Sequence, residues 1–238
     1  MNATERWQDL VADNLSMSSV PGYRQHEISF SAVQAGIANG APDSSSNNFV
    51  IPFSGSSINF AQGELKATGA NMDFALEGPG FFSVQMPDGS TGYTRDGEFH
   101  LDSRGQMVTK QGYKVMSDSG ALMFDPNNSA AINVSAVGEV TQGADIKGKM
   151  KITEFANLKG LTMSSQGYFT ADPTIAKPLQ AANATSLRQG FVEASNTSPT
   201  LAMASLITSM RMFETSQKVM QMQSDRMAKS ISDLSGTN

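Results

Sequence analysis

The feature that most constrains the fold is a run without glycine or proline from Thr200 to Ser235. Alternating steps of three and four residues separate its seam positions, the heptad spacing of a helix that packs against another helix. The seam consists of Leu206, Met210, Phe213, Gln217, Met220, Ser224, Met227, Ile231 and Leu234. Ser198 and Pro199 provide an N-cap and a first-turn proline, and Gly236 follows the run. The sequence therefore predicts one C-terminal helix of roughly 50 Å.

A shorter segment near the start has the same spacing. Its positions are Ala3, Trp7, Leu10, Asn14 and Met17. The pair Pro21–Gly22 then ends the helix. A helix of roughly 15 residues is marginal alone in water, so it needs a partner. We expect it to pair with the C-terminal helix as a coiled coil, parallel or antiparallel. The alternative is that both stripes are ordinary core against the middle of the chain.

The long helix is apolar on a second face as well, because Met212 and Met222 lie off the seam. Flexible methionine side chains suit contacts with several neighbours, and a helix with two apolar faces favours an assembly over a monomer. We therefore predict a subunit interface on the two terminal helices. Its residues are Trp7, Leu10, Asn14, Leu15, Leu206, Met210, Phe213, Gln217, Met220, Met227 and Ile231.

The middle of the chain has the pattern of a sheet. Between Asp73 and Phe124, short runs rich in Phe, Tyr, Val and Thr alternate with turn residues. The predicted strands are Phe81–Met86, Thr91–Arg95, Glu98–Leu101, Gln106–Thr109 and Tyr113–Met116. This spacing is typical of antiparallel hairpins. More strands are expected within Ala131–Phe155, followed by irregular chain to about Leu187.

Five residues of the predicted hairpins are expected to fix their geometry. They are Phe81, Tyr93, Arg95, Asp96 and Phe99. Cross-strand aromatic pairing is favoured here over a direct subunit contact. His100 lies between Phe99 and Leu101, so strand alternation places it on the polar face.

Four segments follow from these patterns. They are an N-terminal helical segment (1–30), an extended connector (31–62), a central β domain (63–190) and a C-terminal helical segment (191–238) that pairs with the first. The connector carries a single charged residue, Asp43. It is either a plain linker or a segment that becomes ordered on contact with a neighbour. The expected fold class is α+β, with an antiparallel β-rich domain flanked by terminal helices that form a coiled coil.

Composition argues against most chemistry. There is no cysteine, which excludes thiolate metal sites and cysteine nucleophiles, and the only two histidines are His26 and His100. No nucleophile elbow or Walker loop is present. Asp96 and Asp102 lie in predicted turns, which explains them without catalysis. We predict a protein that is not an enzyme, with no catalytic, metal or cofactor-binding residue and no cofactor.

Charge and hydropathy limit the partners. The chain has 17 Lys+Arg and 22 Asp+Glu, a net charge of −5, so no nucleic-acid partner is expected. No run approaches the roughly 18 apolar residues of a membrane span, so no membrane insertion is expected. The start of the sequence has no basic segment followed by an apolar core, and we expect no cleaved signal peptide.

Several short segments resemble flagellar basal-body rod and hook proteins, in the right order along nearly the whole chain. They are Ala12–Leu15, Pro21–Arg24, Gln62–Gly63, Thr68–Gly69, Asp73, Gly80–Val84, Tyr93–Phe99, Gly105–Thr109, Gly112–Tyr113, Gln189–Asn196, and Arg211–Glu214 with Lys218. Each match is weak alone, but together they are specific. The family usually extends the first helix further in front of Trp7, so a short inner helix is expected here.

The resemblance implies an axial component of the bacterial flagellum, located in the periplasmic rod of the basal body. Family members leave the cell through the flagellar type III export apparatus and stack helically, with the terminal helices innermost. The implied partners are other copies of the chain and other flagellar axial proteins, and the implied role is torque transmission. The compact middle favours the proximal rod type. The alternatives are a hook or hook-like protein, a secreted oligomeric binding module and, third, a peptidoglycan-cleaving enzyme.

Overall fold

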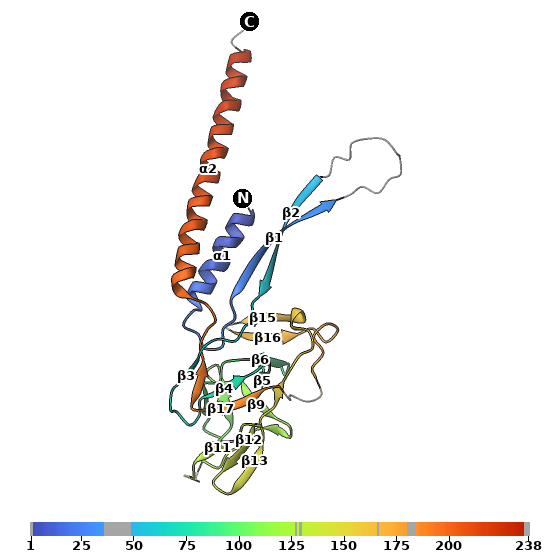
Figure 1. The fold of residues 1–238 in the computed structure, drawn as a ribbon, viewed down its shortest axis with the longest axis vertical. Coiled ribbons are helices and arrows are strands. Elements are labelled where there is room, and N and C mark those ends of the chain that lie inside the picture. Colours follow the sequence, from blue (N-terminus) through green and yellow to red (C-terminus); the bar gives the residue numbers. More distant parts are fainter. Residues whose placement is uncertain are drawn as a thin grey trace, which may run out of the picture. The chain divides into compact units, whose positions relative to one another are not determined.

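The computed structural model describes residues 2–35, 49–126, 128, 130–165, 167–179 and 184–235. The chain forms two compact units. The helical unit comprises Met1–Leu15, His26–Ser57 and Pro199–Asn238, and the β unit comprises Ser16–Gln25 and Ile58–Ser198. The α+β class, with a β-rich domain, a long C-terminal helix and a short N-terminal helix, is confirmed (Figure 1). Pairing of the helices as a coiled coil stays a prediction.

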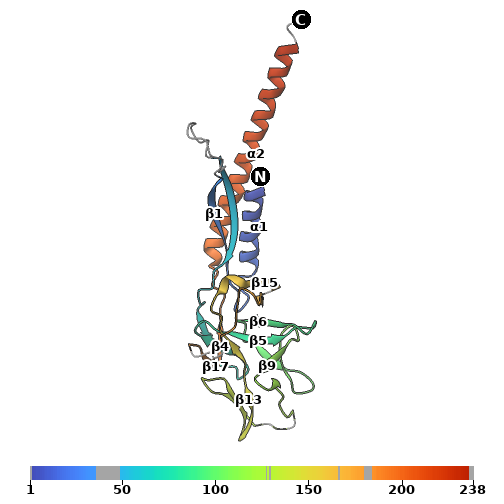
Figure 2. The same cartoon turned by 90° about the vertical axis from the view of Figure 1, so that its right-hand side faces the viewer.

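In the residues that the structure describes, the helical unit has two helices and two strands. Helix α1 spans Asn2–Ser16, and α2 spans the 37 residues Pro199–Ser235, so the predicted first-turn proline is in place. Strands β1 (His26–Ala35) and β2 (Phe49–Ile58) form a two-stranded sheet at the two ends of the predicted connector. Residues 36–48 of that connector, and the helix stop at Gly236, lie outside the described residues. In both views α1 runs beside the first part of α2 (Figure 1, Figure 2).

A nine-stranded sheet forms the centre of the β unit. Its path is β15-β16-β6-β5-β9-β8-β7, with β10 paired to β9 and β14 paired to β5. The bounds are β5 Phe81–Gln85, β6 Thr91–Thr94, β7 Phe99–Leu101, β8 Met107–Thr109, β9 Lys114–Ser117, β10 Gly120–Ala121, β14 Ile152–Thr153, β15 Leu161–Ser165 and β16 Tyr168–Ala171. The five strands predicted between residues 81 and 116 are thus confirmed as β5 to β9, and their pairs are antiparallel.

Smaller sheets complete this unit. Strands β11 (Ile132–Val134), β12 (Glu139–Gln142) and β13 (Asp145–Lys149) form an antiparallel three-stranded sheet. Strand β17 (Ser186–Gln189) pairs with β4 (Phe74–Glu77), and β18 (Phe191–Glu193) pairs with β3 (Leu65–Ala67). The last two strands of the unit, β17 and β18, are therefore hydrogen-bonded to β4 and β3, which precede the central sheet in sequence.

The prediction of irregular chain up to about Leu187 is wrong. Strands β15 and β16 form a hairpin there, preceded by the short 3₁₀ helix η1 (Leu158–Gly160), and β17 begins at Ser186. Gly167 stands at the turn of the hairpin with φ +86°, a value that glycine adopts without strain. Tyr168 and Phe169 follow it and are buried, and in β15 Leu161 and Met163 alternate with polar residues, so a short strand pattern is present that the prediction misses.

Strand β5 is buried on both faces. Phe81 belongs to one core cluster, with Phe155, Leu161, Phe169 and Ala176. Phe82 belongs to a second and larger cluster, which includes Val84 and Phe99. Successive side chains of a strand point to opposite faces, so the adjacent pair Phe81 and Phe82 places one aromatic ring in each cluster. This explains why the strand lacks the polar alternation of a half-exposed sheet.

No helix among the described residues is long and apolar enough to cross a membrane.

Candidate assembly surface

Helix α2 changes character halfway along its length. Its buried and half-buried side chains are Ala202, Ser205, Leu206, Ser209, Phe213 and Ser216. These positions follow the three-and-four spacing of one helix face. From Gln217 to Ser232 every side chain is exposed. One face of the first half of α2 is therefore covered within the chain, whereas no face of residues 217–232 is covered.

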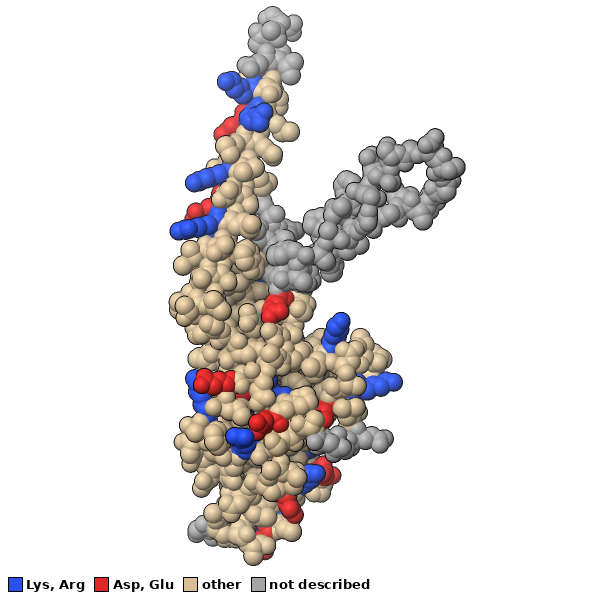
Figure 3. Space-filling view, in the orientation of Figure 1, with Lys and Arg blue, Asp and Glu red and all other residues tan. Residues whose placement is uncertain are grey.

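The uncovered half carries large apolar side chains. Among the described residues, ten of the fifteen exposed large hydrophobic side chains lie on α2. In the second half, Met220 is 53% exposed, Met222 57%, Met227 71% and Ile231 67%. In Figure 3 charged side chains lie at several places along the upper half of α2, and uncharged residues, polar and apolar alike, lie between them. Exposed apolar side chains that recur along one helix in this way favour a contact with another molecule.

Helix α1 is half-covered in the same unit. Trp7, Leu10 and Leu15 are half-buried, and Val11 is only 7% exposed. Asn14 is buried, and its side chain binds the main chain of His26: Nδ2 donates to the carbonyl oxygen at 2.7 Å, and Oδ1 accepts from the N–H at 2.8 Å. Asn14 therefore connects α1 to the start of β1 within one molecule. Burial lowers the pKa of His26, and the Asp13 carboxylate partly offsets this.

The predicted interface residues fall into two groups. Half-buried or buried in the helical unit are Trp7, Leu10, Asn14, Leu15, Leu206 and Phe213. Exposed on α2 are Met210, Gln217, Met220, Met227 and Ile231. The first group is already in contact with its own chain, whereas the second is available to another molecule.

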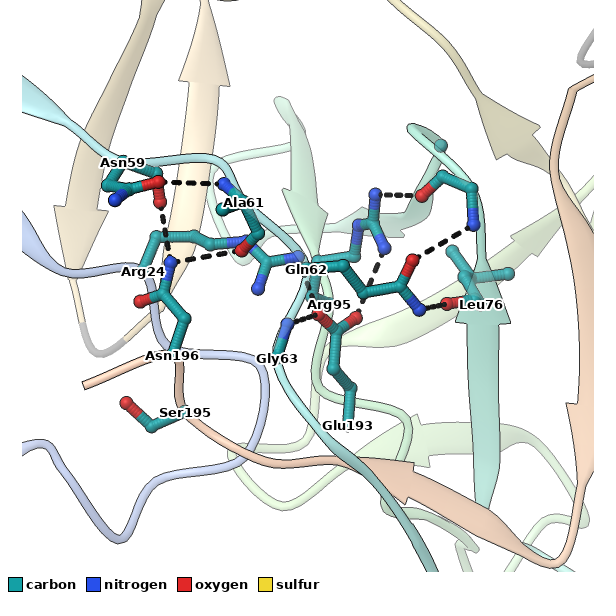
Figure 4. Close-up of polar contacts among 12 residues, drawn as sticks. Arg24, Asn59, Ala61, Gln62, Gly63, Leu76, Arg95, Glu193, Ser195 and Asn196 are labelled. Atoms are coloured by element: carbon teal, nitrogen blue, oxygen red, sulfur yellow. Dashed lines mark hydrogen bonds and ion pairs between the residues drawn. The ribbon is translucent and has the colours of Figure 1, made fainter. Parts of the chain in front are cut away.

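A buried ion cluster lies in the β unit around Glu193 of β18. The carboxylate is fully buried, with Oε1 2.7 Å from Arg24 Nη2 and Oε2 3.1 Å from Arg95 Nη1. Oε1 also accepts the main-chain N–H of Gly63 at 2.8 Å (Figure 4). The carbonyl oxygen of Glu193 accepts the N–H of Gly22 at 2.8 Å. One residue thus binds three segments that are distant in sequence.

Asn196, three residues further on, binds neighbouring parts of the same segments. Its Oδ1 accepts the main-chain N–H of Gln25 at 2.7 Å. Its Nδ2 donates to the carbonyl oxygens of Asn59 at 2.8 Å and Ala61 at 3.0 Å, as the dashed lines of Figure 4 show. Its own N–H donates to the carbonyl of Tyr23 at 3.3 Å. We call Arg24, Arg95, Glu193 and Asn196 the chain anchor.

Arg95 is predicted as part of the hairpin framework, and its side chain also belongs to the chain anchor. Nη2 donates to the carbonyl of Gly78 at 2.6 Å, and the guanidinium lies 4.9 Å from the centre of the Phe81 ring. Burial lowers the pKa of Arg95 to about 10; Glu193 acts against this and Arg24 adds to it. Even so, Arg95 stays charged at neutral pH, as an ion pair with Glu193 requires.

Two positions beside the chain anchor are glycine because the neighbouring main chain leaves no room for a Cβ atom. A Cβ on Gly63 would lie 2.0 Å from the carbonyl oxygen of Ala194. Gly22 has φ +68°, and a Cβ there would lie 2.4 Å from the carbonyl carbon of Arg95. Any larger residue would separate the segments that the anchor joins.

The other predicted framework residues lie in or beside the hairpins. Tyr93 contacts Phe155 edge to face at 4.8 Å between ring centres, and Phe82 contacts Phe99 in the same way at 5.1 Å. Asp96 accepts the N–H of Glu98 at 3.0 Å through Oδ1, which forms the turn before β7. Burial raises the pKa of Asp96 to about 6.

Sequence reasoning does not identify Arg24, Glu193 and Asn196 as site residues. Their only signal is their position in the family-like segments Pro21–Arg24 and Gln189–Asn196. The described residues hold no group of three His, Cys, Asp or Glu side chains placed to bind a metal ion.

Comparison with known proteins gives two matching family models. The model described as the flagellar hook protein FlgE/F/G D1 domain matches residues 75–171, and the flagellar basal body rod FlgEFG protein C-terminal model matches residues 188–234. The first covers the central sheet, and the second runs from β17 to near the end of α2.

Individual relatives align along almost the whole chain. The flagellar basal-body rod protein FlgF of Caulobacter vibrioides is 31% identical over 213 residues, which is 89% of this chain and 85% of the relative. FlgG of Borreliella burgdorferi is 30% identical over 241 residues (93% and 90%). FlgG of Buchnera aphidicola subsp. Schizaphis graminum is 29% identical over 255 residues (98% and 96%).

Proposed function

Because the chain belongs to the flagellar basal-body rod protein family, we propose that it acts by helical assembly through its terminal helices. It is a structural component of the rod, and its place is the flagellar basal body. Its partners there include other flagellar axial proteins. We further propose that copies of the chain stack on one another and transmit torque as a stiff axial tube.

The observation that carries the proposal is the uncovered half of α2. Burying each large apolar side chain there stabilises an assembly by roughly 1.5–3 kcal/mol. From Gln217 to Ser232 no described side chain of α2 is covered within the chain. We therefore expect another molecule to cover this half of the helix. When such a contact joins two different surfaces and repeats by rotation and translation, it produces an open helical filament.

The first half of α2 has a different role in this proposal. Trp7, Leu10 and Leu15 of α1 pack against Leu206 and Phe213 as a short coiled coil, within the helical unit. Met210, Gln217, Met220, Met227 and Ile231 then contact neighbouring subunits. The two groups of predicted interface residues thus differ in role, since the half-buried group stabilises the subunit and the exposed group joins subunits.

Further parts of the proposal rest on the family resemblance. The chain is exported through the flagellar type III export apparatus without a cleaved signal. It works as a structural protein without enzymatic activity or cofactor, and its net charge of −5 makes nucleic acid an unfavourable partner. The segments 1–30, 31–62, 63–190 and 191–238 are proposed as helical, connecting, β and helical parts.

Deletion of the gene tests the proposed function. We expect loss of swimming motility and basal bodies whose rod is incomplete in electron micrographs. Expression of the wild-type chain in the deletion strain should restore both. A complete rod in the absence of this protein would contradict the proposal.

A hook-like role is the second candidate, because the matching D1 model carries the name of the hook protein along with the rod proteins. Antibody labelling of purified hook–basal bodies separates the two. Label on the rod supports the first proposal, and label along the external hook supports the second.

A further inference from the structure

We propose that Glu193 and Asn196 form a latch that orders the N-terminal linker, residues 16–25, only when the C-terminal segment 191–196 is in place. The latch is distinct from the assembly surface on α2 and does not depend on the proposed function. Residues 16–25 can therefore become ordered only after residues 191–196, which are synthesised much later, have folded against them.

The contacts of the linker carry the inference. Gly22 donates its N–H to the Glu193 carbonyl oxygen, and Arg24 forms an ion pair of 2.7 Å with the Glu193 carboxylate. Gln25 donates its N–H to Asn196 Oδ1, and Tyr23 accepts the N–H of Asn196. Four successive residues of the linker, 22 to 25, are thus bound to two residues of the C-terminal segment.

A second segment depends on the same two residues. Gly63 donates its N–H to the Glu193 carboxylate, and Asn196 Nδ2 donates to the carbonyl oxygens of Asn59 and Ala61. Asn59 in turn donates its N–H to the carbonyl of Gln25. The linker therefore has a neighbour that the latch also binds, and Phe60 of this neighbour is held separately by its contacts with the rings of Phe81 and Phe169.

The electrostatics make Glu193 hard to replace. Arg24 and Glu193 are both fully buried, and Arg95 is only 2% exposed. None of the three guanidinium nitrogens of Arg24 has a hydrogen-bond partner among the described residues, so the Glu193 carboxylate holds this side chain as an ion pair. Without the Glu193 carboxylate, two buried guanidinium groups would face each other with no anion between them. A buried charge without a partner is strongly unfavourable, and Arg24 can reach water by moving out with the linker.

The core of the β unit does not depend on the latch. Neither hydrophobic cluster of the unit contains a residue of the linker, although the linker carries Met17, Val20 and Tyr23. Release of the linker therefore leaves the aromatic packing of the central sheet in place. This predicts local opening rather than global unfolding.

Trypsin cleavage after Arg24 in the full-length Glu193→Gln variant tests the latch. In the wild type this bond is protected, because Arg24 is fully buried. In the variant we expect cleavage after Arg24 to accelerate by about 10- to 100-fold, since proteolysis follows the population of the opened form. Mass spectrometry identifies the fragment that begins at Gln25, and hydrogen exchange of the β5 and β9 amides, the signal of the β unit, should be unchanged.

Glu77→Gln is the matched control. Glu77 Oε2 lies 2.8 Å from Arg188 Nη2, but both side chains are about half exposed (49% and 50%). This variant removes the same carboxylate from an exposed ion pair and should leave cleavage after Arg24 at the wild-type rate. Unchanged protection of Arg24 in Glu193→Gln would overturn the latch, and so would loss of the β-unit signal together with the linker.

Asn196→Ala provides a second variant that leaves no buried charge. Hydrogen exchange of the Gly22 and Gln25 amides should accelerate in it, while amides of β5 and β9 keep their wild-type protection. If Asn196→Ala changes the exchange of Gln25 alone, through loss of its direct bond, the linker is not a cooperative segment and the proposal fails.

Discussion

The side chain of Asn196 accepts a 2.7 Å hydrogen bond from the main-chain N–H of Gln25, a residue 171 positions earlier in the sequence. The same amide donates to Asn59 and Ala61, which follow β2. All three segments belong to the β unit and adjoin the helical unit in sequence. One asparagine therefore fixes the places at which the chain enters and leaves the β unit, and a single ion cluster at Glu193 supports it.

Phe213→Asp should abolish assembly and leave the β unit folded. Phe213 is half-buried on α2, and it belongs to neither core cluster of the β unit. A carboxylate there opposes packing in the helical unit, which supports the helix that joins subunits. Electron microscopy and sedimentation report assembly, and calorimetry reports the β unit. Melting of the β unit with the substitution would favour the alternative that α2 is ordinary core.

Met227→Asp should weaken assembly without destabilising the monomer. Met227 is 71% exposed, so the free energy of unfolding should change by less than about 0.5 kcal/mol. Loss of its burial in an assembly should raise the concentration needed for polymerisation by about tenfold or more. Gln221→Asp, at an exposed position on another face of α2, is the control. If both variants raise the concentration needed for polymerisation equally, the added negative charge, and not the lost burial of Met227, is the cause.

Hydrogen exchange of the monomer should divide α2 into two parts. Amides near Leu206 and Ser209 should be protected, because their face is covered within the chain, and amides from Gln217 to Ser232 should exchange rapidly. Assembly should then protect the second part. Strong protection throughout residues 200 to 230 of the monomer would contradict the view that this surface awaits another molecule.

Asp96→Asn should stabilise the β unit at neutral pH and have little effect in acid. Burial raises the pKa of Asp96 to about 6, so the stability that its protonated form contributes is lost as the pH rises from about 4 to 6. Asparagine keeps an oxygen for the Glu98 N–H and carries no charge. We expect a gain of about 1–2 kcal/mol at pH 7.5 and almost none below pH 4. Urea unfolding of the variant and the wild type across this pH range measures the difference in the free energy of unfolding. A gain that does not vary with pH would show that the raised pKa of Asp96 is not its cause.

Gly97→Ala should destabilise the β unit by about 1–3 kcal/mol, because its Cβ would lie 1.7 Å from the carbonyl oxygen of Phe74. Gly89→Ala is the control. A Cβ at Gly89 meets nothing within 4 Å, so only the cost of its φ of +83° remains. Urea unfolding of both variants compares the steric cost with the conformational one. A smaller loss for Gly97→Ala than for Gly89→Ala would contradict the close approach.

Local patterns are sufficient to predict the long helix and β5 to β9. Proline and glycine mark their ends, and short apolar runs between turns restrict the register. The hairpin β15–β16 has such a pattern as well, since Leu161 and Met163 alternate with polar residues and Tyr168 and Phe169 follow Gly167. Strands of four and five residues give a short signal, which does not by itself separate a strand from irregular chain.

The chain anchor cannot be predicted from spacing. Arg24 and Glu193 each look like surface residues in their own segments, and only the fold brings their charges together. For Asn14 the sequence pattern predicts a residue of the subunit interface, but the structure shows a different contact. Its heptad position suggests a polar contact between helices, whereas its amide binds the main chain of His26. Periodicity identifies a face of a helix but not the group that the face meets.

The exposed thioethers of α2 have a chemical consequence. Met220, Met222 and Met227 are each more than half exposed, so a peroxide reaches their sulfur atoms freely in the monomer. Conversion to the sulfoxide makes an apolar side chain polar, which would spoil the surface on which polymerisation depends. Once subunits cover these atoms, the same oxidant should react slowly. Peroxide would then oxidise unassembled subunits faster than assembled ones.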